Sequence, residues 1–170
     1  DQSLYTCRDL SVLVYTDDFM STYPDTPAGH QLYKSFIAML KSKYELRDDG
    51  MQDCVDFVGL HFEFSADRSV CHITQPLKVQ QLIESSGLGA CRPHFTPGTP
   101  NVLVSDLDCQ APDDFEQLDF MKNEPYRRRI GQLLWLSQST RPDIAYQVNA
   151  LARVAHNPGK AHWEATTYLI

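Results

Sequence analysis

The chain has 170 residues, of which 42% are hydrophobic and 22% charged, as in a globular protein with its own core. Its net charge of −7 argues against a general nucleic-acid-binding surface. No apolar run approaches the roughly 18 residues of a membrane span, and no signal peptide opens the sequence. Because the first residue is Asp rather than Met, we expect a piece of a longer protein.

The most informative stretch lies near the start of the chain. Leu10–Tyr15 is apolar and rich in Val, which predicts a buried strand, and Phe19–Met20 resumes the apolar pattern. Between them lie Asp17 and Asp18, and an unpaired carboxylate is costly to bury. We therefore expect a hairpin tip that turns both carboxylates toward one point. Oxygen ligands suit Mg²⁺ or Mn²⁺, which predicts a metal site; an ordinary Asp-containing turn is the alternative.

Strand and helix patterns alternate through the first half of the chain. The residue types and their spacing predict the elements from local sequence alone. We expect strands over 3–7 and 10–15, a helix over 29–44, a strand over 55–64 with Gly59 as a bulge, a hairpin loop at 65–69, a partner strand over 70–74, and a helix from Pro76 that Gly87 ends.

The second half changes character after a break rich in Pro at residues 92–100. Residues 101–121 hold six acidic residues and no Lys or Arg, which predicts an irregular, mobile loop over 104–119. Residues 122–160 hold seven basic residues against two acidic ones, so nucleic-acid contacts are expected there if anywhere. Apolar spacing predicts helices over 126–137 and 142–155 and from Lys160 onward.

The five cysteines are far apart and form no CxxC pair. They are Cys7, Cys54, Cys71, Cys91 and Cys109. An odd, scattered set predicts free thiols in a reducing compartment. His72 and His94 follow two of these cysteines closely and raise a zinc site as an alternative, which the lack of a second ligand pair at zinc-binding spacing weakens.

Several segments, taken in order, resemble the motifs of one family. The tetrad Tyr15-Thr16-Asp17-Asp18 resembles YxDD, Asp56–Leu60 resembles YFLGI, and Thr96-Pro97 resembles a TP boundary. Further on, the chain resembles the YRxxIGxLxYL, TRPDI and HWxA motifs at residues 126–136, 140–144 and 162–163. The set resembles copia-type (Pseudoviridae-like) long-terminal-repeat retrotransposon reverse transcriptases, which are parts of a Pol polyprotein.

The resemblance implies an α+β fold, with an antiparallel palm sheet and packed helices followed by an all-α thumb- or connection-like segment. Residues 1–95 would form a partial palm with a primer-grip-like hairpin and the first thumb-like helix. Residues 96–121 would form an acidic linker. Residues 122–170 would form the helical segment, truncated before ribonuclease H. An intracellular location, in a cytoplasmic particle or the nucleus, is also implied.

The resemblance also implies the chemistry of an RNA-directed DNA polymerase. It assigns catalysis and metal ligation to Asp17 and Asp18, and it places Tyr15 and Thr16 near the primer end. Candidates near the nucleic acid further along are Arg127, Arg128 and Arg129. Two Mg²⁺ or Mn²⁺ ions would support nucleotidyl transfer from a deoxynucleotide to a primer 3′-hydroxyl. The implied partners are an RNA or DNA template-primer, the deoxynucleotide and the rest of the Pol polyprotein.

The same comparison shows what the chain lacks. Such polymerases need a third carboxylate from an earlier strand, and Asp1 and Asp9 lie too close to the YxDD tetrad to supply it. The fingers would also lie upstream and ribonuclease H downstream, so we expect the isolated chain to be inactive. Two alternatives stay open: a non-catalytic or co-opted remnant that at most binds nucleic acid or a protein partner, and an unrelated α+β domain. The alternative for the three arginines is that they form the solvent-exposed first turn of a helix and bind no ligand.

Overall fold

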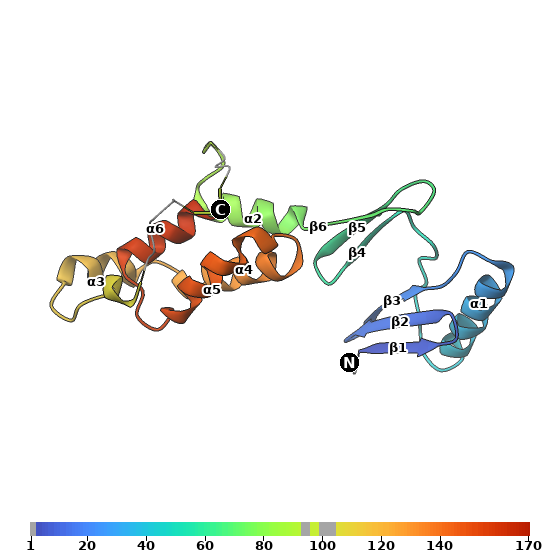
Figure 1. Cartoon of the computed structure of the whole chain (residues 1–170). Helices are drawn as coiled ribbons and strands as arrows, with labels where there is room; N and C mark the ends of the chain where they lie inside the picture. The colour runs from blue at the N-terminus through green and yellow to red at the C-terminus, as the bar shows by residue number, and fades with distance from the viewer. Residues whose placement is uncertain (1–2, 93–95, 99–104) are drawn as a thin grey trace. The chain divides into compact units, whose positions relative to one another are not determined.

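The structure, a computed structural model, describes residues 3–92, 96–98 and 105–170. It is a mixed α+β protein with two three-stranded sheets and six α-helices within those ranges, as the sequence predicted at this level (Figure 1). The chain divides into two compact units, Asp1–Ile73 and Thr74–Ile170, which are described separately below. Within the described ranges, the helices are too short or too polar to cross a membrane.

The first sheet has β2 (Leu10–Tyr15) at its centre, between β1 (Leu4–Cys7) and β3 (Asp18–Thr22). Both pairings are antiparallel, and the two predicted strands over 3–7 and 10–15 are confirmed as β1 and β2. Alternation along β2 buries Leu10 and Val12 on one face. That face packs against α1 (Pro27–Lys41). There the rings of Phe19 and Phe36 meet edge to face, with their centres 6.1 Å apart.

Helix α1 begins two residues before the predicted start and ends at Lys41 instead of residue 44. The earlier start has a local cause: the Thr26 hydroxyl accepts the Gly29 N–H at 3.1 Å, and Pro27 occupies the first helical position. Gly29 is required here because a Cβ would collide with the Pro24 carbonyl. The sequence pattern located the helix body correctly and missed its cap.

The second sheet contains β4 (Cys54–Phe57), β5 (Leu60–Phe64) and β6 (Cys71–Thr74) in that order. The prediction of one strand over 55–64 with a bulge is wrong, because the chain reverses at Val58-Gly59 and Phe57 pairs with Leu60. Both turn residues have positive φ, 52° and 75°, as a tight hairpin turn of type I′ requires. The predicted loop at 65–69 is confirmed.

The second unit is helical after β6. Helix α2 (Pro76–Ser86) ends as predicted at Gly87, whose φ of 68° gives the left-handed cap. After the acidic segment come α4 (Tyr126–Ser139), a 3₁₀ turn η2 (Pro142–Ile144), α5 (Ala145–Arg153) and α6 (Lys160–Tyr168). The bidentate pair of Arg141 with Asp143 fixes the α4–α5 junction, with Nη2 2.8 Å from Oδ2.

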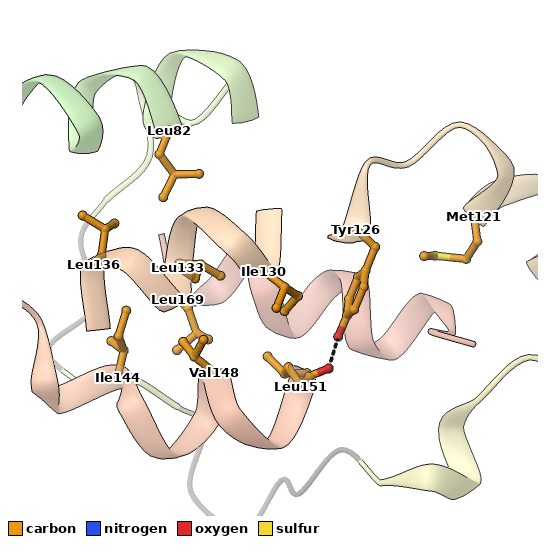
Figure 2. Packing of buried hydrophobic residues seen from close by; sticks show 10 residues of the cluster. All are labelled: Leu82, Met121, Tyr126, Ile130, Leu133, Leu136, Ile144, Val148, Leu151 and Leu169. Atoms are coloured by element: carbon orange, nitrogen blue, oxygen red, sulfur yellow. Dashed lines mark hydrogen bonds between the residues drawn. The ribbon is translucent and has the colours of Figure 1, made fainter. Parts of the chain in front are cut away.

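Helix α4 forms the centre of the core in this unit (Figure 2). Its inward positions meet α2, α5 and the end of α6, and Leu133 and Val148 are fully buried. The Tyr126 hydroxyl donates a hydrogen bond to the Leu151 carbonyl at 2.9 Å, which satisfies its polar atom inside the cluster. The buried cluster comprises Leu82, Met121, Tyr126, Ile130, Leu133, Leu136, Ile144, Val148, Leu151 and Leu169.

The acidic segment differs from the predicted irregular loop. It contains a 3₁₀ turn η1 (Asp106–Asp108) and a helix α3 (Phe115–Lys122), capped where Asp114 accepts the Gln117 N–H at 3.0 Å. The Asn157 side chain donates to the Gln110 carbonyl at 3.0 Å, and the Lys160 N–H donates to Gln117 Oε1 at 2.7 Å. These bonds tie the segment to the start of α6. The linker's residues 99–104 lie outside the described residues.

The unit boundary also differs from the predicted one. The sequence places the break at residues 95 and 96, whereas the structure places it between Ile73 and Thr74. The reason is that Leu82 of α2 is buried in the cluster around α4. Helix α2 therefore belongs to the second unit.

Candidate functional site

The tetrad Tyr15 to Asp18 forms the tip of the β2–β3 hairpin. Thr16 and Asp17 make the turn, and Tyr15 pairs with Asp18 across it, so the predicted hairpin tip is confirmed. Thr16 has a positive φ of 54°, an unusual conformation for a β-branched residue. All four side chains are exposed, while the buried part of β2 anchors the hairpin. The fold thus holds two neighbouring carboxylates out toward solvent.

The two carboxylates of the tip differ from most aspartates of the first unit in having no partner. Within the described part of the chain, neither Asp17 nor Asp18 makes a side-chain hydrogen bond or ion pair. By contrast, six other aspartates of this unit each hydrogen-bond to a side chain. The pairs are Asp25 with His30, Asp48 with Tyr33, Asp49 with Arg47, Asp53 with Arg68, Asp56 with His61 and Asp67 with Ser65. The adjacent negative charges of the tip are therefore uncompensated. A divalent cation would relieve their repulsion.

As ligands, the two aspartates fit Mg²⁺ better than zinc. No group of three or more His, Cys, Asp or Glu side chains suited to a metal occurs among residues 3–92, 96–98 and 105–170. This argues against a protein-enclosed zinc site, although His94 lies outside those ranges. Mg²⁺ is commonly held by one or two carboxylates together with waters and substrate phosphates. Asp17 and Asp18 match that pattern.

As predicted, Cys7, Cys54, Cys71 and Cys91 are free thiols, and all four are exposed. Cys109 is half-buried. None of them contributes to the carboxylate tip.

The structure separates the three candidate arginines at the start of α4. Arg129 is only 7% exposed, with its guanidinium 3.4 Å from the centre of the Trp163 ring. Its Nη1 donates to the Thr167 hydroxyl at 2.9 Å. Burial lowers the pKa of Arg129, and the negative charge of Glu124 acts in the opposite direction. Arg129 therefore packs inside the second unit, and its predicted place near nucleic acid stays a prediction.

Arg127 and Arg128, in contrast, are exposed. The Nε of Arg127 donates to the Ala155 carbonyl at 3.0 Å, which orients the side chain and leaves its terminal nitrogens unused. Arg128 has no hydrogen-bond or ion-pair partner among the residues that the structure describes. Of the three, these two are available to an anionic partner.

Sequence reasoning missed the outer face of α4. Gly131 and Trp135 follow Arg128 on that exposed side at spacings of three and four residues. A Cβ on Gly131 would meet nothing within 4 Å, so this part of the helix surface is open. Trp135 is 38% exposed beside it. The sequence did contain a signal for this face: Gly131 lies inside a helical pattern, and Trp135 follows it one turn later.

The chain is similar over most of its length to retrotransposon Pol polyproteins. It is 26% identical over 163 residues, or 94% of this chain, to the retrovirus-related Pol polyprotein from transposon TNT 1-94 of Nicotiana tabacum. It is 28% identical over 155 residues to the one from transposon RE2 of Arabidopsis thaliana. An uncharacterized mitochondrial protein of Arabidopsis thaliana is 27% identical over 156 residues.

This chain spans only part of those relatives: 11% and 9% of the two polyproteins and 56% of the mitochondrial protein. No protein-family model matches the sequence, and no solved structure matches the fold. The similarity is consistent with a fragment derived from a retroelement Pol polyprotein.

Proposed function

We propose that the chain is part of the RNA-directed DNA polymerase of a retrotransposon, in which the β2–β3 tip supplies two carboxylates to a divalent metal site. The observation that carries this proposal is the exposed, unpartnered pair Asp17 and Asp18 at the end of an anchored hairpin. The similarity to Pol polyproteins over nine-tenths of the chain supports it.

In the complete enzyme, bound Mg²⁺ or Mn²⁺ would supply the Lewis acidity that activates a primer hydroxyl and offsets charge on the pyrophosphate leaving group. Asp17 and Asp18 would hold the ions and thereby position the reacting phosphate. Tyr15, which pairs with Asp18 across the hairpin, would lie near the primer end, together with Thr16 of the turn.

Nucleic acid would contact the second unit through the outer face of α4. Arg128 offers a cation to the backbone, Gly131 allows close approach, and Trp135 presents an exposed aromatic surface. Arg127 lies at the same end of the helix. This face suits a negatively charged, stacked polymer although the whole chain is acidic, because two exposed arginines, Arg127 and Arg128, lie at one end of α4.

The proposal predicts that divalent cations bind at the tip of the isolated chain. We expect Mn²⁺ to broaden the amide NMR signals of residues 15–18 selectively, because a bound paramagnetic ion relaxes nearby nuclei. Asp17→Asn and Asp18→Asn should each weaken the effect strongly. Asp9→Asn is the matched control, since Asp9 is an exposed turn aspartate at the opposite end of β2. Equal broadening in all variants would contradict the proposal.

Two carboxylates alone should not sustain polymerisation, so we predict no primer extension by the 170-residue chain on its own. The test is extension of a labelled primer on an RNA template with Mg²⁺. Extension that is abolished by Asp17→Asn would show that the chain is complete enough for catalysis and would refute this prediction.

A second candidate function is a non-catalytic remnant that retains the fold. Among the residues that the structure describes, no group of three or more His, Cys, Asp or Glu side chains could hold a metal ion, which favours this reading for the chain itself. It predicts a folded protein whose tip binds no Mn²⁺. The NMR titration above therefore discriminates between the two functions.

A further inference from the structure

A surface pocket of about 330 Å³ lies in the second unit where α4 begins and where the chain turns after α5. Its walls include Met121, Tyr126 and Pro158. Arg127, Arg128 and His156 complete the lining. The pocket includes no residue of the carboxylate tip, and it shares Arg128 with the outer face of α4.

The lining carries more positive than negative charge. Arg127 and Arg128 make no ion pair in the part of the chain that the structure describes, and His156 adds a third basic group. Glu124 is the one acidic residue among the lining residues described. The lining therefore sets two arginines against one glutamate, and this positive balance favours an anion.

The arrangement of the arginines suits a phosphate group in particular. The Nε of Arg127 is bound to the Ala155 carbonyl, so its side chain is oriented in advance and both terminal nitrogens stay available. Arg128 is adjacent and unrestrained. A guanidinium fork binds phosphate oxygens in pairs, and a fork held in place loses less freedom on binding.

The walls and the size indicate what else the ligand carries. Met121 and Tyr126 are 6% and 3% exposed and belong to the buried cluster, so this side of the pocket is rigid. The Tyr126 hydroxyl is engaged with Leu151, which leaves the phenol ring as an apolar surface. About 330 Å³ is at the small end of ligand pockets and is of the size of one nucleotide.

We propose that this pocket binds a terminal phosphate carried on a single nucleotide unit, with the phosphate at Arg127 and Arg128 and the nucleoside against Met121, Tyr126 and Pro158. The source is a free mononucleotide or the 5′-phosphorylated end of a strand. The site does not use Asp17 or Asp18. It adds a nucleotide site to the proposed polymerase fragment and stands independently of the metal site.

Calorimetric titration of the full chain tests the proposal. The probes are deoxyadenosine monophosphate, inorganic phosphate, and an octanucleotide with and without a 5′-phosphate. We expect the mononucleotide to bind more tightly than inorganic phosphate. Arg128→Gln should weaken it by about tenfold or more, because one charge-assisted contact is lost. Arg153→Gln removes an exposed arginine of α5 outside the pocket and should leave the affinity within about twofold.

The outcomes divide cleanly. Binding of both the mononucleotide and the 5′-phosphorylated strand identifies a strand end as the ligand, and binding of the mononucleotide alone identifies a free nucleotide; both support the proposal. Equal affinity for the unphosphorylated strand, an unchanged affinity in Arg128→Gln, or no binding of any probe overturns it. Asp17→Asn should bind the mononucleotide normally, so failure of the metal site and failure of this pocket are distinguished. Thermal melts of the exposed arginine variants confirm that each is folded.

Discussion

Three consecutive arginines at the start of α4 differ in exposure: Arg127 and Arg128 face solvent, whereas Arg129 is buried. The sequence offers three arginines in a row, and nothing in the run itself indicates that one of them is buried. Its burial depends on Trp163 and Thr167, more than thirty residues later. The outward pair could be predicted from charge, whereas the inward one required the tertiary structure.

At this scale we predict that Arg129→Lys destabilises the second unit by about 1–3 kcal/mol, because the ammonium keeps the charge but loses the stacked guanidinium and its hydrogen bond. Arg128→Lys, which changes an exposed side chain, should shift the free energy of unfolding by less than about 0.5 kcal/mol. Urea unfolding followed by circular dichroism measures both. Equal effects of the two substitutions would contradict the structural role of Arg129.

Asp67 allows a prediction about pH. The Ser65 hydroxyl, followed by the Ser69 N–H and hydroxyl, binds this carboxylate and lowers its pKa to about 2. Because the pKa is lowered on folding, the contribution of Asp67 to the β5–β6 loop is fully present above the ordinary Asp pKa of about 3.9 and is lost as the pH falls toward 2.

An NMR titration of the Asp67 side chain should give a midpoint near pH 2, the lowered pKa of the folded protein. Ser65→Ala should raise this pKa toward the ordinary Asp range. A midpoint that does not move in Ser65→Ala would show that the hydroxyl is not the main cause of the shift.

Among the elements, those with strong local signals were predicted well. The β2 strand, the α2 helix with its Gly87 cap and the body of α4 follow from alternation, helical spacing and a left-handed glycine. Alternation could not separate β4 from β5, because apolar residues flank Gly59 on both sides. The cap of α3 is local, but the bonds that hold the acidic segment come from residues 157–162 and are invisible to a local pattern.

Two glycines give opposite expectations for the same substitution. Gly131→Ala should stabilise α4 by about 0.5–1 kcal/mol, because a Cβ there meets nothing and alanine favours the helix. Gly159→Ala should destabilise the second unit, because a Cβ would collide with the Asp108 carbonyl and the Gln117 side chain at the start of α6. Thermal unfolding of the two variants measures the contrast, and a loss of stability in Gly131→Ala would mean that this face is covered.

For the molecule as a whole, the sequence identified the α+β class and the carboxylate tip but not how the chain divides. The Pro-rich break at 92–100 suggested the boundary, yet the division falls after Ile73, because burial of Leu82 makes α2 part of the helical unit. Likewise, the tetrad at residues 15–18 was recognisable from adjacent residues, while the pocket at the start of α4 combines residues as far apart in the sequence as Gln110 and Pro158. Sites made from one hairpin can be predicted from sequence, and sites assembled by packing cannot.

The central claim, that Asp17 and Asp18 are metal ligands of a polymerase, is tested most directly by primer extension. The assay uses an RNA template, Mg²⁺ and the longest encoded polypeptide that contains this chain. We predict extension by the unmodified polypeptide and by the Asp9→Asn control, and its loss in both Asp17→Asn and Asp18→Asn. Extension that persists in either tip variant, or a folded polypeptide that never extends a primer, would contradict the account.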